Sequence, residues 1–158
     1  MRKALTGSIA ALILVADLLS KAIVEAHIGL YTTVNVISSF NLVHIYNRGM
    51  SFGILASSSV HAPYILSFLG ICIIAVLGRW LMKAETALQE IALASIIGGA
   101  ASNIVDRLYD GAVTDFIDFY VGTYHWPAFN LADIAVVCGV AALMFDAFHF
   151  NGVRRSHI

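Results

Sequence analysis

Charged residues are scarce in this chain of 158 residues, where Asp, Glu, Lys and Arg together make up 12% of the sequence. Soluble proteins carry about 25%. The net charge of −1 leaves no basic excess, and no run of Lys or Arg is longer than two residues, which excludes the electrostatic footprint of a nucleic-acid-binding protein. Because hydrophobic residues make up 59% of the chain, the composition indicates a membrane protein.

Cysteines and clustered metal ligands are also lacking. Cys72 and Cys138 stand inside apolar runs without CxxC or CxxH spacing, so neither a disulfide framework nor a zinc site is indicated. We interpret both as packing residues. The histidines, such as His27, His61 and His125, are scattered without an HExxH motif, and we expect most of them to be solvated or interfacial.

Long apolar stretches are abundant. A stretch of about 20 residues crosses a hydrocarbon core of about 30 Å, and four occur, over residues 4–24, 62–82, 87–107 and 129–149. The first follows a basic start as a signal peptide would, but it is long and contains Asp17 and Lys21, so we expect a retained helix. The chain is therefore predicted to be an all-α integral membrane protein with four transmembrane helices, forming a single domain over residues 1–158.

The distribution of basic residues predicts the orientation. With a cytoplasmic N-terminus, six of the nine Lys and Arg residues fall on the cytoplasmic side, namely Arg2, Lys3, Arg79, Lys83, Arg154 and Arg155. Both termini are then cytoplasmic. The connections over residues 25–61 and 108–128 are extracytoplasmic, and the short turn between the second and third helices faces the cytoplasm.

The first extracytoplasmic connection alternates in polarity. Apolar residues of one parity (Val34, Val36, Phe40, Leu42) interleave with polar residues of the other (Asn35, Ser39, Asn41). Alternation of this kind is typical of strands with one apolar face. We therefore expect a small β-sheet and loop region on the membrane surface.

Two serines lie in sequence patterns that resemble those of nucleophilic serines, but the structural surroundings that such nucleophiles require are not predicted here. Ser51 lies in "GMSFG", which matches the G-x-S-x-G elbow of α/β hydrolases, but that elbow requires a large parallel sheet that a short four-helix chain lacks. Ser20 and Lys21 are adjacent, so they point about 100° apart on a helix and do not face each other. Neither serine is predicted to be catalytic.

Carboxylates gather in one region instead. Residues 103–133 contain five of the ten acidic residues, and Asp106 and Asp110 have simple structural interpretations, an ion pair with Arg107 and a turn. Asp115 lies between apolar neighbours beside a membrane, where burial should raise the pKa of its carboxyl group. Asp118 follows three residues later and is expected to be less enclosed.

Asp133 stands at the start of the fourth helix. Asn130 is predicted to be the N-cap and Asp133 the carboxylate at the third position, stabilised by the helix dipole. A carboxylate kept ionised there suits a second one that is pushed towards protonation, because two close carboxylates share a proton. One can activate water while the other hydrogen-bonds the carbonyl under attack. The pattern is compatible with aspartic-protease chemistry.

Two other classes of function remain open on the residues alone. A small ion-coupled or proton-coupled transporter subunit could use Asp17, Lys21, Asp106 and Arg107 as a buried relay. A structural membrane subunit could use polar residues to join helices. The sequence shows no inverted repeat of the kind that transporters carry, and neither alternative explains why polar residues collect at one end of the predicted bundle.

Five motifs in order resemble those of the lipoprotein signal peptidase family, also called signal peptidase II. They cover nearly the whole chain and are "DLLSK" (17–21), "NRGMSFG" (47–53), "GGAASNIVDR" (98–107), "VTDFI" (113–117) and "FNLAD" (129–133). Each motif is weak alone, but five in register are specific. Met50 and Ser51 depart from the pattern, because the family usually has small residues such as alanine there.

The resemblance implies a role for particular residues. The catalytic aspartates of the family fall on Asp115 and Asp133. Its substrate-binding or dyad-supporting residues fall on Asp17, Lys21, Asn47, Gly49, Asn103, Arg107 and Asn130. The helix-terminus argument favours Asp133 as the aspartate that starts ionised.

The resemblance also implies an activity and a place. The family consists of aspartic endopeptidases of the bacterial inner membrane that remove the signal peptide from prolipoproteins, cleaving before a diacylglyceryl-modified cysteine. The expected partners are therefore prolipoproteins and membrane lipid, with the protein as a monomer and no nucleic acid. The active site would lie at the extracytoplasmic face, and no metal or organic cofactor is implied.

Overall fold

The four predicted membrane-spanning stretches all form helices. A computed structural model describes residues 2–49 and 61–155 of the chain. Within this part, four helices are long and apolar enough to cross a membrane. They are α1 (Arg2–His27), α2 (Ala62–Met82), α3 (Ala87–Tyr109) and α4 (Leu131–Arg155). The predicted fold class is confirmed, although α4 begins two residues later than the apolar stretch suggests.

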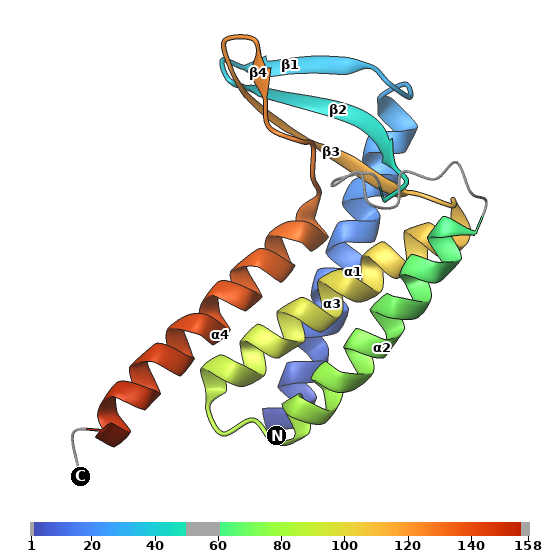
Figure 1. The fold of residues 1–158 in the computed structure, drawn as a ribbon. Coiled ribbons are helices and arrows are strands. Elements are labelled where there is room, and N and C mark those ends of the chain that lie inside the picture. The colour runs from blue at the N-terminus through green and yellow to red at the C-terminus, as the bar shows by residue number, and fades with distance from the viewer. Residues whose placement is uncertain (1, 50–60, 156–158) are drawn as a thin grey trace.

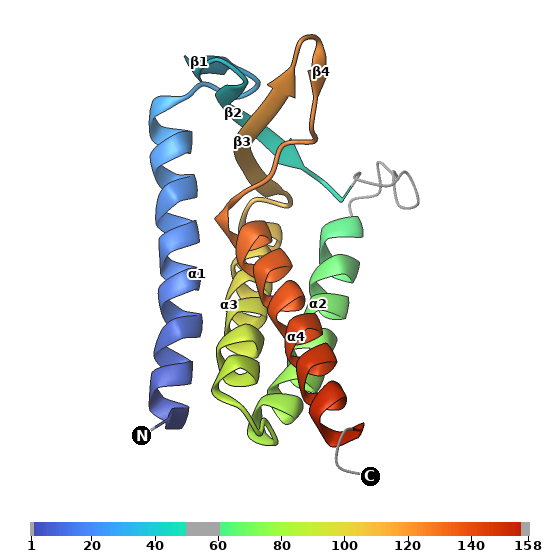
Figure 2. The ribbon, with the colours of Figure 1, turned by 90° about the vertical axis from the view of Figure 1, so that its left-hand side faces the viewer.

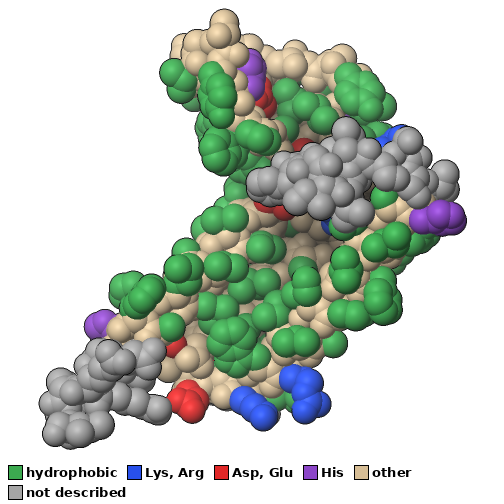
Figure 3. Space-filling model, in the orientation of Figure 1, with side chains coloured by type: hydrophobic (Ala, Val, Ile, Leu, Met, Phe, Trp, Pro, Cys, Tyr) green, Lys and Arg blue, Asp and Glu red, His purple; other side chains and the backbone are tan. Residues whose placement is uncertain are grey.

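The helices form a bundle with a small sheet at one end. Figures 1 and 2 show the sheet above the helices and both chain termini at the opposite end. Helix α3 packs against each of the other three helices. The face of the bundle shown in Figure 3 is largely covered by hydrophobic side chains, and charged side chains lie at its lower end. This distribution suits a bundle surrounded by lipid.

Close contacts between the helices depend on two adjacent glycines in α3. A Cβ atom on Gly98 would lie 2.5 Å from the carbonyl oxygen of Ala10 in α1, and one on Gly99 would lie 2.5 Å from that of Ala132 in α4. Both distances are far shorter than van der Waals contact. Small residues allow membrane helices to approach in this way. Gly99 therefore sets the distance between α3 and the first turn of α4.

The lower end of the bundle is held by a buried carboxylate. Asp146 of α4 accepts hydrogen bonds from Thr86 Oγ1 at 3.0 Å and Gln89 Nε2 at 2.6 Å. Thr86 also caps α3, because its Oγ1 accepts from the backbone N–H of Gln89 at 3.0 Å. A negative charge near a helix N-terminus is favourable. Asp146 thus fixes the start of α3 against α4.

The sheet joins the two connections that lie between the helices. Its strands are β1 (Thr33–Ile37), β2 (Phe40–Asn47), β3 (Val113–Val121) and β4 (Tyr124–His125), in the order β1-β2-β3-β4, and all neighbours are antiparallel. Strands β1 and β2 match the predicted alternating segment. The pairing of β2 with β3 brings residues from the two halves of the chain together at one end of the bundle.

The apolar face predicted for the first strands is only partly covered by the protein. Every residue of β1 is exposed, including Val34 and Val36, whereas Leu42 of β2, which pairs with Val34, packs against the hydrophobic core. In β2 the polar residue Asn41 is buried, since it is hydrogen-bonded to the neighbouring strand β3. The pairing of β2 with β3 also shifts register between Leu42 and Ile45. This shift breaks the simple alternation.

The interpretation of the cysteines also needs correction. Cys72 and Cys138 are free, as the sequence indicated, but both are exposed on the outside of the bundle. They therefore do not pack inside the protein core. A helix of a membrane protein can carry apolar residues on every face, because lipid covers those that the protein does not. Hydrophobic surroundings in the sequence thus did not distinguish core from lipid-facing positions.

Candidate active site

Asp115 and Asp133 lie where the sheet meets the bundle. Asp115 belongs to β3 and is 2% exposed, whereas Asp133 belongs to the first turn of α4 and is half-buried. A short bridge holds their segments together: the backbone N–H of Ile117 donates to the carbonyl oxygen of Phe129 at 2.8 Å, and that of Phe129 donates back at 3.1 Å. The bridge therefore holds the segment that precedes α4 beside strand β3.

Asn130 caps α4 and links the two aspartates. Its Oδ1 accepts a hydrogen bond from the backbone N–H of Asp133 at 2.9 Å, and the Asp133 carboxylate reaches back to the N–H of Asn130 at 3.3 Å. This reciprocal cap was predicted and is confirmed. The Nδ2 of the same asparagine donates to Asp115 Oδ1 at 2.7 Å. One fully buried side chain thus contacts both residues of the pair.

Asn47 holds the other oxygen of Asp115. Its Nδ2 donates to Asp115 Oδ2 at 2.9 Å, and its Oδ1 accepts from the backbone N–H of Gly49 at 2.9 Å. Gly49 has a φ of 93°, which favours glycine. The sequence prediction placed Gly49 beside the pair, and the structure connects it through Asn47. Met50 and Ser51 lie outside the described residues.

Asn103 contacts the other carboxylate. Its Nδ2 donates to Asp133 Oδ1 at 2.9 Å, and its Oδ1 accepts from Lys21 Nζ at 2.9 Å. Arg107 contributes from the next turn of α3, where its NH1 donates to the backbone oxygen of Asn103 at 3.1 Å. The asparagines therefore contact the pair directly, whereas Lys21 and Arg107 contact Asn103.

The three asparagines have one possible orientation each. Lysine and backbone N–H groups can only donate, so the amide oxygens of Asn47, Asn103 and Asn130 must face them. Each amide NH2 group must then point at a carboxylate. The two aspartates are consequently held entirely by groups that donate hydrogen bonds, which leaves them the acceptors in every one of these contacts.

Lys21 is the centre of a buried ionic cluster. Its Nζ lies 2.6 Å from a carboxylate oxygen of Asp17 and 2.6 Å from one of Asp106. The sequence suggested that Asp106 pairs with Arg107, and this is wrong: the ion pair is with Lys21, on a helix that the sequence alone does not place nearby. Ser20, as predicted, does not face Lys21; its hydroxyl donates to the backbone oxygen of Asp17 at 2.7 Å.

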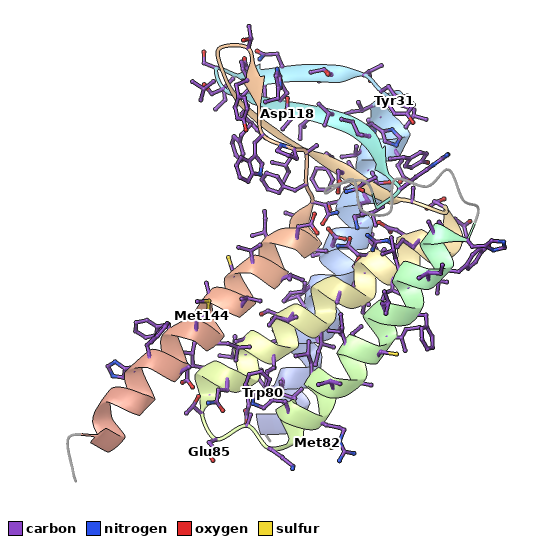
Figure 4. The ribbon with its side chains drawn as sticks, in the orientation of Figure 1. Tyr31, Trp80, Met82, Glu85, Asp118 and Met144 are labelled. Atoms are coloured by element: carbon purple, nitrogen blue, oxygen red, sulfur yellow. The ribbon has the colours of Figure 1, made fainter. Side chains whose placement is uncertain are left out.

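Asp118 lies away from this site but is not open to solvent. It is 6% exposed, against 2% for Asp115, so it is slightly less enclosed than Asp115, as expected, but still buried. Its carboxylate accepts from Asn41 Nδ2 at 2.8 Å and lies 2.9 Å from Nδ1 of His125. Figure 4 shows Asp118 in the sheet, at the far end of the molecule from Met82 and Glu85. Its contacts join β2, β3 and β4 to one another.

Burial changes the acidity of Asp115. Loss of hydration, together with the charge of Asp133, raises the pKa of its carboxyl group to about 7, although hydrogen bonds from Asn47 and Asn130 act in the opposite direction. The raised pKa was predicted from the apolar neighbours and is confirmed. A carboxyl group with this pKa can exchange a proton near neutral pH.

Two contacts near the site were not predicted. Ser102 is fully buried and donates to Asp17 Oδ2 at 2.7 Å. Thr114 Oγ1 donates to Glu25 Oε1 at 2.5 Å, which joins β3 to the end of α1. Ser102 stands four residues after Gly98 and hence on the same helix face, which is a signal that could have been used. Nothing in the sequence pairs Thr114 with Glu25.

The described residues show no metal-binding cluster. Over residues 2–49 and 61–155, no three His, Cys, Asp or Glu side chains are grouped in a way that would hold a metal ion. His27, His61 and His125 are exposed, as expected, whereas His44 is buried and contacts the backbone oxygen of Ile28.

Known proteins are similar to this chain in sequence. Residues 9–149 match the model of the peptidase A8 family, described as "Signal peptidase (SPase) II". The lipoprotein signal peptidase of Haemophilus influenzae is 45% identical over 142 residues, covering 89% of this chain and 83% of that protein. The lipoprotein signal peptidase of Actinobacillus succinogenes is 42% identical over 151 residues, covering 94% and 92%.

Solved structures are similar as well. One bacterial membrane enzyme, determined by the in meso method, superposes with a TM-score of 0.81 at 25% identity and covers 92% of this chain and 88% of its own. A second has a TM-score of 0.80, also at 25% identity, and covers 91% and 92%. The bundle with its terminal sheet is therefore an architecture already seen in a membrane enzyme.

Proposed function

The chain belongs to the signal peptidase II family of membrane aspartic peptidases, and on that premise we propose that Asp115 and Asp133 are its catalytic pair. The observation that carries this assignment is the contact of Asn130 with both residues, at 2.7 Å from Asp115 Oδ1 and 2.9 Å from the backbone N–H of Asp133. Its substrates are prolipoproteins. We propose cleavage before the diacylglyceryl-modified cysteine.

The proposed roles of the two aspartates differ. Asp133 starts ionised, because it lies at the N-terminus of α4 and accepts hydrogen bonds from Asn103 and from the backbone of Asn130. Asp115 starts protonated, because it is more deeply buried and its pKa is about 7. Two carboxyl groups in different environments can act as base and acid in one reaction.

Hydrolysis then proceeds by two proton transfers. Asp133 removes a proton from a water molecule as its oxygen attacks the scissile carbonyl carbon, while the Asp115 carboxyl group hydrogen-bonds the carbonyl oxygen. The tetrahedral intermediate collapses when its C–N bond breaks and the leaving nitrogen takes the proton held by Asp133. The products are a carboxylic acid and an amine, and the pair returns to its starting state.

Other polar residues hold the pair in place. Asn47 orients Asp115 and is itself positioned by the backbone of Gly49. Asn103 orients Asp133 and is positioned by Lys21. Arg107 lies beside Asn103, where its charge can also meet a substrate carbonyl. Lys21 pairs with Asp17 and Asp106 and also donates to Asn103 of this site. This arrangement favours a supporting role for Lys21 over a part in the proton or ion relay of a transporter.

We propose that residues 1–158 act as one membrane-embedded peptidase domain and as a monomer. The sheet would face the extracytoplasmic side, since Arg79 and Lys83 lie at the other end of the bundle, near Met82 and Glu85 (Figure 4). Tyr124 in β4 and the nearby Trp126 are 69% and 61% exposed, and Tyr and Trp are residues typical of a membrane interface. Acyl chains of a substrate could stay in the bilayer while the peptide reaches the aspartates.

Tags at Met1 and Ile158 should both be cytoplasmic. The expectation follows from the even number of spans and from the excess of Lys and Arg at the ends of the helices opposite to the sheet. Protease digestion of intact cells should leave both tags uncut, whereas disruption of the cells should expose them. Digestion of either tag from outside would contradict this orientation.

Turnover should fall as the pH rises through about 7. The proposed acid is the protonated form of Asp115, whose pKa of about 7 means that this form predominates below pH 7 and is lost above it. We expect kcat, measured at saturating prolipoprotein, to show this alkaline limb, with a midpoint that belongs to the coupled pair. The variant Asp118→Asn should keep the same midpoint. A kcat that stays constant well above pH 7 would rule out Asp115 as the acid.

A further inference from the structure

Ser102 makes an unusual contact for a serine within a helix. It lies in α3, is fully buried, and its Oγ donates to Asp17 Oδ2 of α1 at 2.7 Å. We propose that Ser102 is a positioning residue of the peptidase, which holds the Asp17 carboxylate and through it the first turn of α4 that carries Asp133. This inference rests on the proposed assignment of Asp133 to the catalytic pair.

Ser95 on the same helix provides a contrast. A serine inside a helix commonly hydrogen-bonds the carbonyl oxygen four residues earlier. Ser95 does so, since its Oγ donates to the backbone oxygen of Ile91 at 2.9 Å. Ser102 instead directs its hydroxyl to another helix. The contact with Asp17 is therefore a specific cross-helix interaction and not the ordinary behaviour of the residue.

The position of Ser102 in α3 makes this contact possible. Gly98 lies one turn earlier and on the same face, where its missing side chain lets α1 approach the backbone of α3 closely. A serine on that face has a short side chain and a donor. It can fill the narrow space between the helices and still satisfy a buried carboxylate oxygen, which would otherwise be costly.

Two sets of contacts connect Asp17 to the catalytic site. Its Oδ1 accepts from the backbone N–H of Ala132 at 2.8 Å, so a side chain of α1 caps α4 at the residue directly before Asp133. Its Oδ2 pairs with Lys21 at 2.6 Å, and Lys21 continues to Asn103, which donates to Asp133. A rotation of the Asp17 carboxylate would therefore disturb both the backbone and the side chain of the proposed base.

The hydroxyl of Ser102 restrains that rotation. Asp17 Oδ2 has two donors, Ser102 and Lys21, and Lys21 is shared with Asp106 and Asn103. Without the hydroxyl, the competing partners of Lys21 can draw the ammonium group away from Asp17. The expected result is a misplaced Asp133, which affects the chemical step more than the binding of the prolipoprotein.

The test compares two substitutions that separate the hydroxyl from packing. Ser102→Ala removes the donor and keeps the site uncrowded, so kcat should fall about ten-fold with KM almost unchanged and little loss of thermal stability. Ser102→Thr keeps the donor and adds a methyl group, so it should lower stability but retain most of kcat. Ser95→Ala, the matched control on the same helix, should behave as the wild type.

A double substitution makes the test independent of folding differences. If Ser102 acts through Asp17, adding Ser102→Ala to Asp17→Asn should reduce kcat no further than Asp17→Asn alone. If the double variant instead shows the product of the two single losses of kcat, the inference is overturned. A wild-type kcat for Ser102→Ala would also overturn it, as would a kcat that follows thermal stability across the Ala and Thr variants. If Asp133→Asn itself retains turnover, the assignment of the pair fails first; if only Ser102→Ala is silent, the pair stands and this inference alone falls.

Discussion

Asp115→Asn and Asp133→Asn should each abolish cleavage of a diacylated prolipoprotein while the protein still inserts in the membrane. The change keeps the shape of the side chain but removes the group that can accept or hold the shared proton. Loss of an acid or a base costs roughly 10²–10⁴-fold in rate. Turnover should be measured with purified protein in detergent, together with a spectrum that shows intact helices. Because the two aspartates act as one unit, the double variant should be little worse than either single one.

Asp118→Asn is the matched control for this experiment. Asp118 lies on the same strand as Asp115, is also buried and also accepts hydrogen bonds, but its partners are Asn41 and His125 in the sheet. Its replacement should weaken the sheet and leave much of the activity. If Asp118→Asn were inactive and Asp115→Asn active, the assignment of Asp115 to the catalytic pair would be wrong. Near-normal turnover of both Asp115→Asn and Asp133→Asn would remove the aspartic mechanism itself. A chelator should leave the wild-type rate unchanged.

Lys21→Met should prevent the protein from folding stably, and with it nearly all turnover should be lost. Lys21 is 2% exposed and lies between the carboxylates of Asp17 and Asp106. Methionine is similar in length but leaves two buried carboxylates without a cation. Breaking a buried ion pair from one side costs about 3–5 kcal/mol, which is a large part of the stability of a typical protein.

Thermal unfolding in detergent and yield from the membrane fraction measure this effect. Lys83→Met is the control, because Lys83 is exposed at the end of α2 and should tolerate the change. Adding Asp106→Asn to Lys21→Met should recover part of the stability by removing one of the two stranded charges, without recovering activity. A Lys21→Met protein with wild-type unfolding temperature and turnover would show that the buried cluster is dispensable.

The local features of this site could be predicted from the sequence. The cap formed by Asn130 and Asp133 depends on residues three positions apart, and the raised pKa of Asp115 depends on apolar neighbours in the same strand. Both signals are carried by a short segment. The lengths of the apolar stretches likewise indicated the helices, because the thickness of a bilayer sets them.

The long-range contacts could not be predicted in the same way. Asp106 is followed by Arg107 in the sequence, yet it pairs with Lys21, because the approach of α1 to α3 at Gly98 decides which cation is near. The burial of Asp118 depends on the register of β2 against β3, which an irregularity in the ladder shifts. The strand that follows α3 has an almost continuous buried run from Val113 to Phe116, and no alternation marks it as a strand.

The hydrogen bond from the Ala132 backbone to Asp17 joins residues 115 positions apart. A side chain of α1 thus caps the first turn of α4, and Asp133 has its full set of partners only when both helices are in the membrane. During synthesis the N-terminal helix is made and inserted first and the C-terminal helix last. A nascent chain whose α4 has not yet been inserted in the membrane therefore contains no assembled peptidase. Proteolytic activity is therefore expected only once α1 and α4 have met in the membrane.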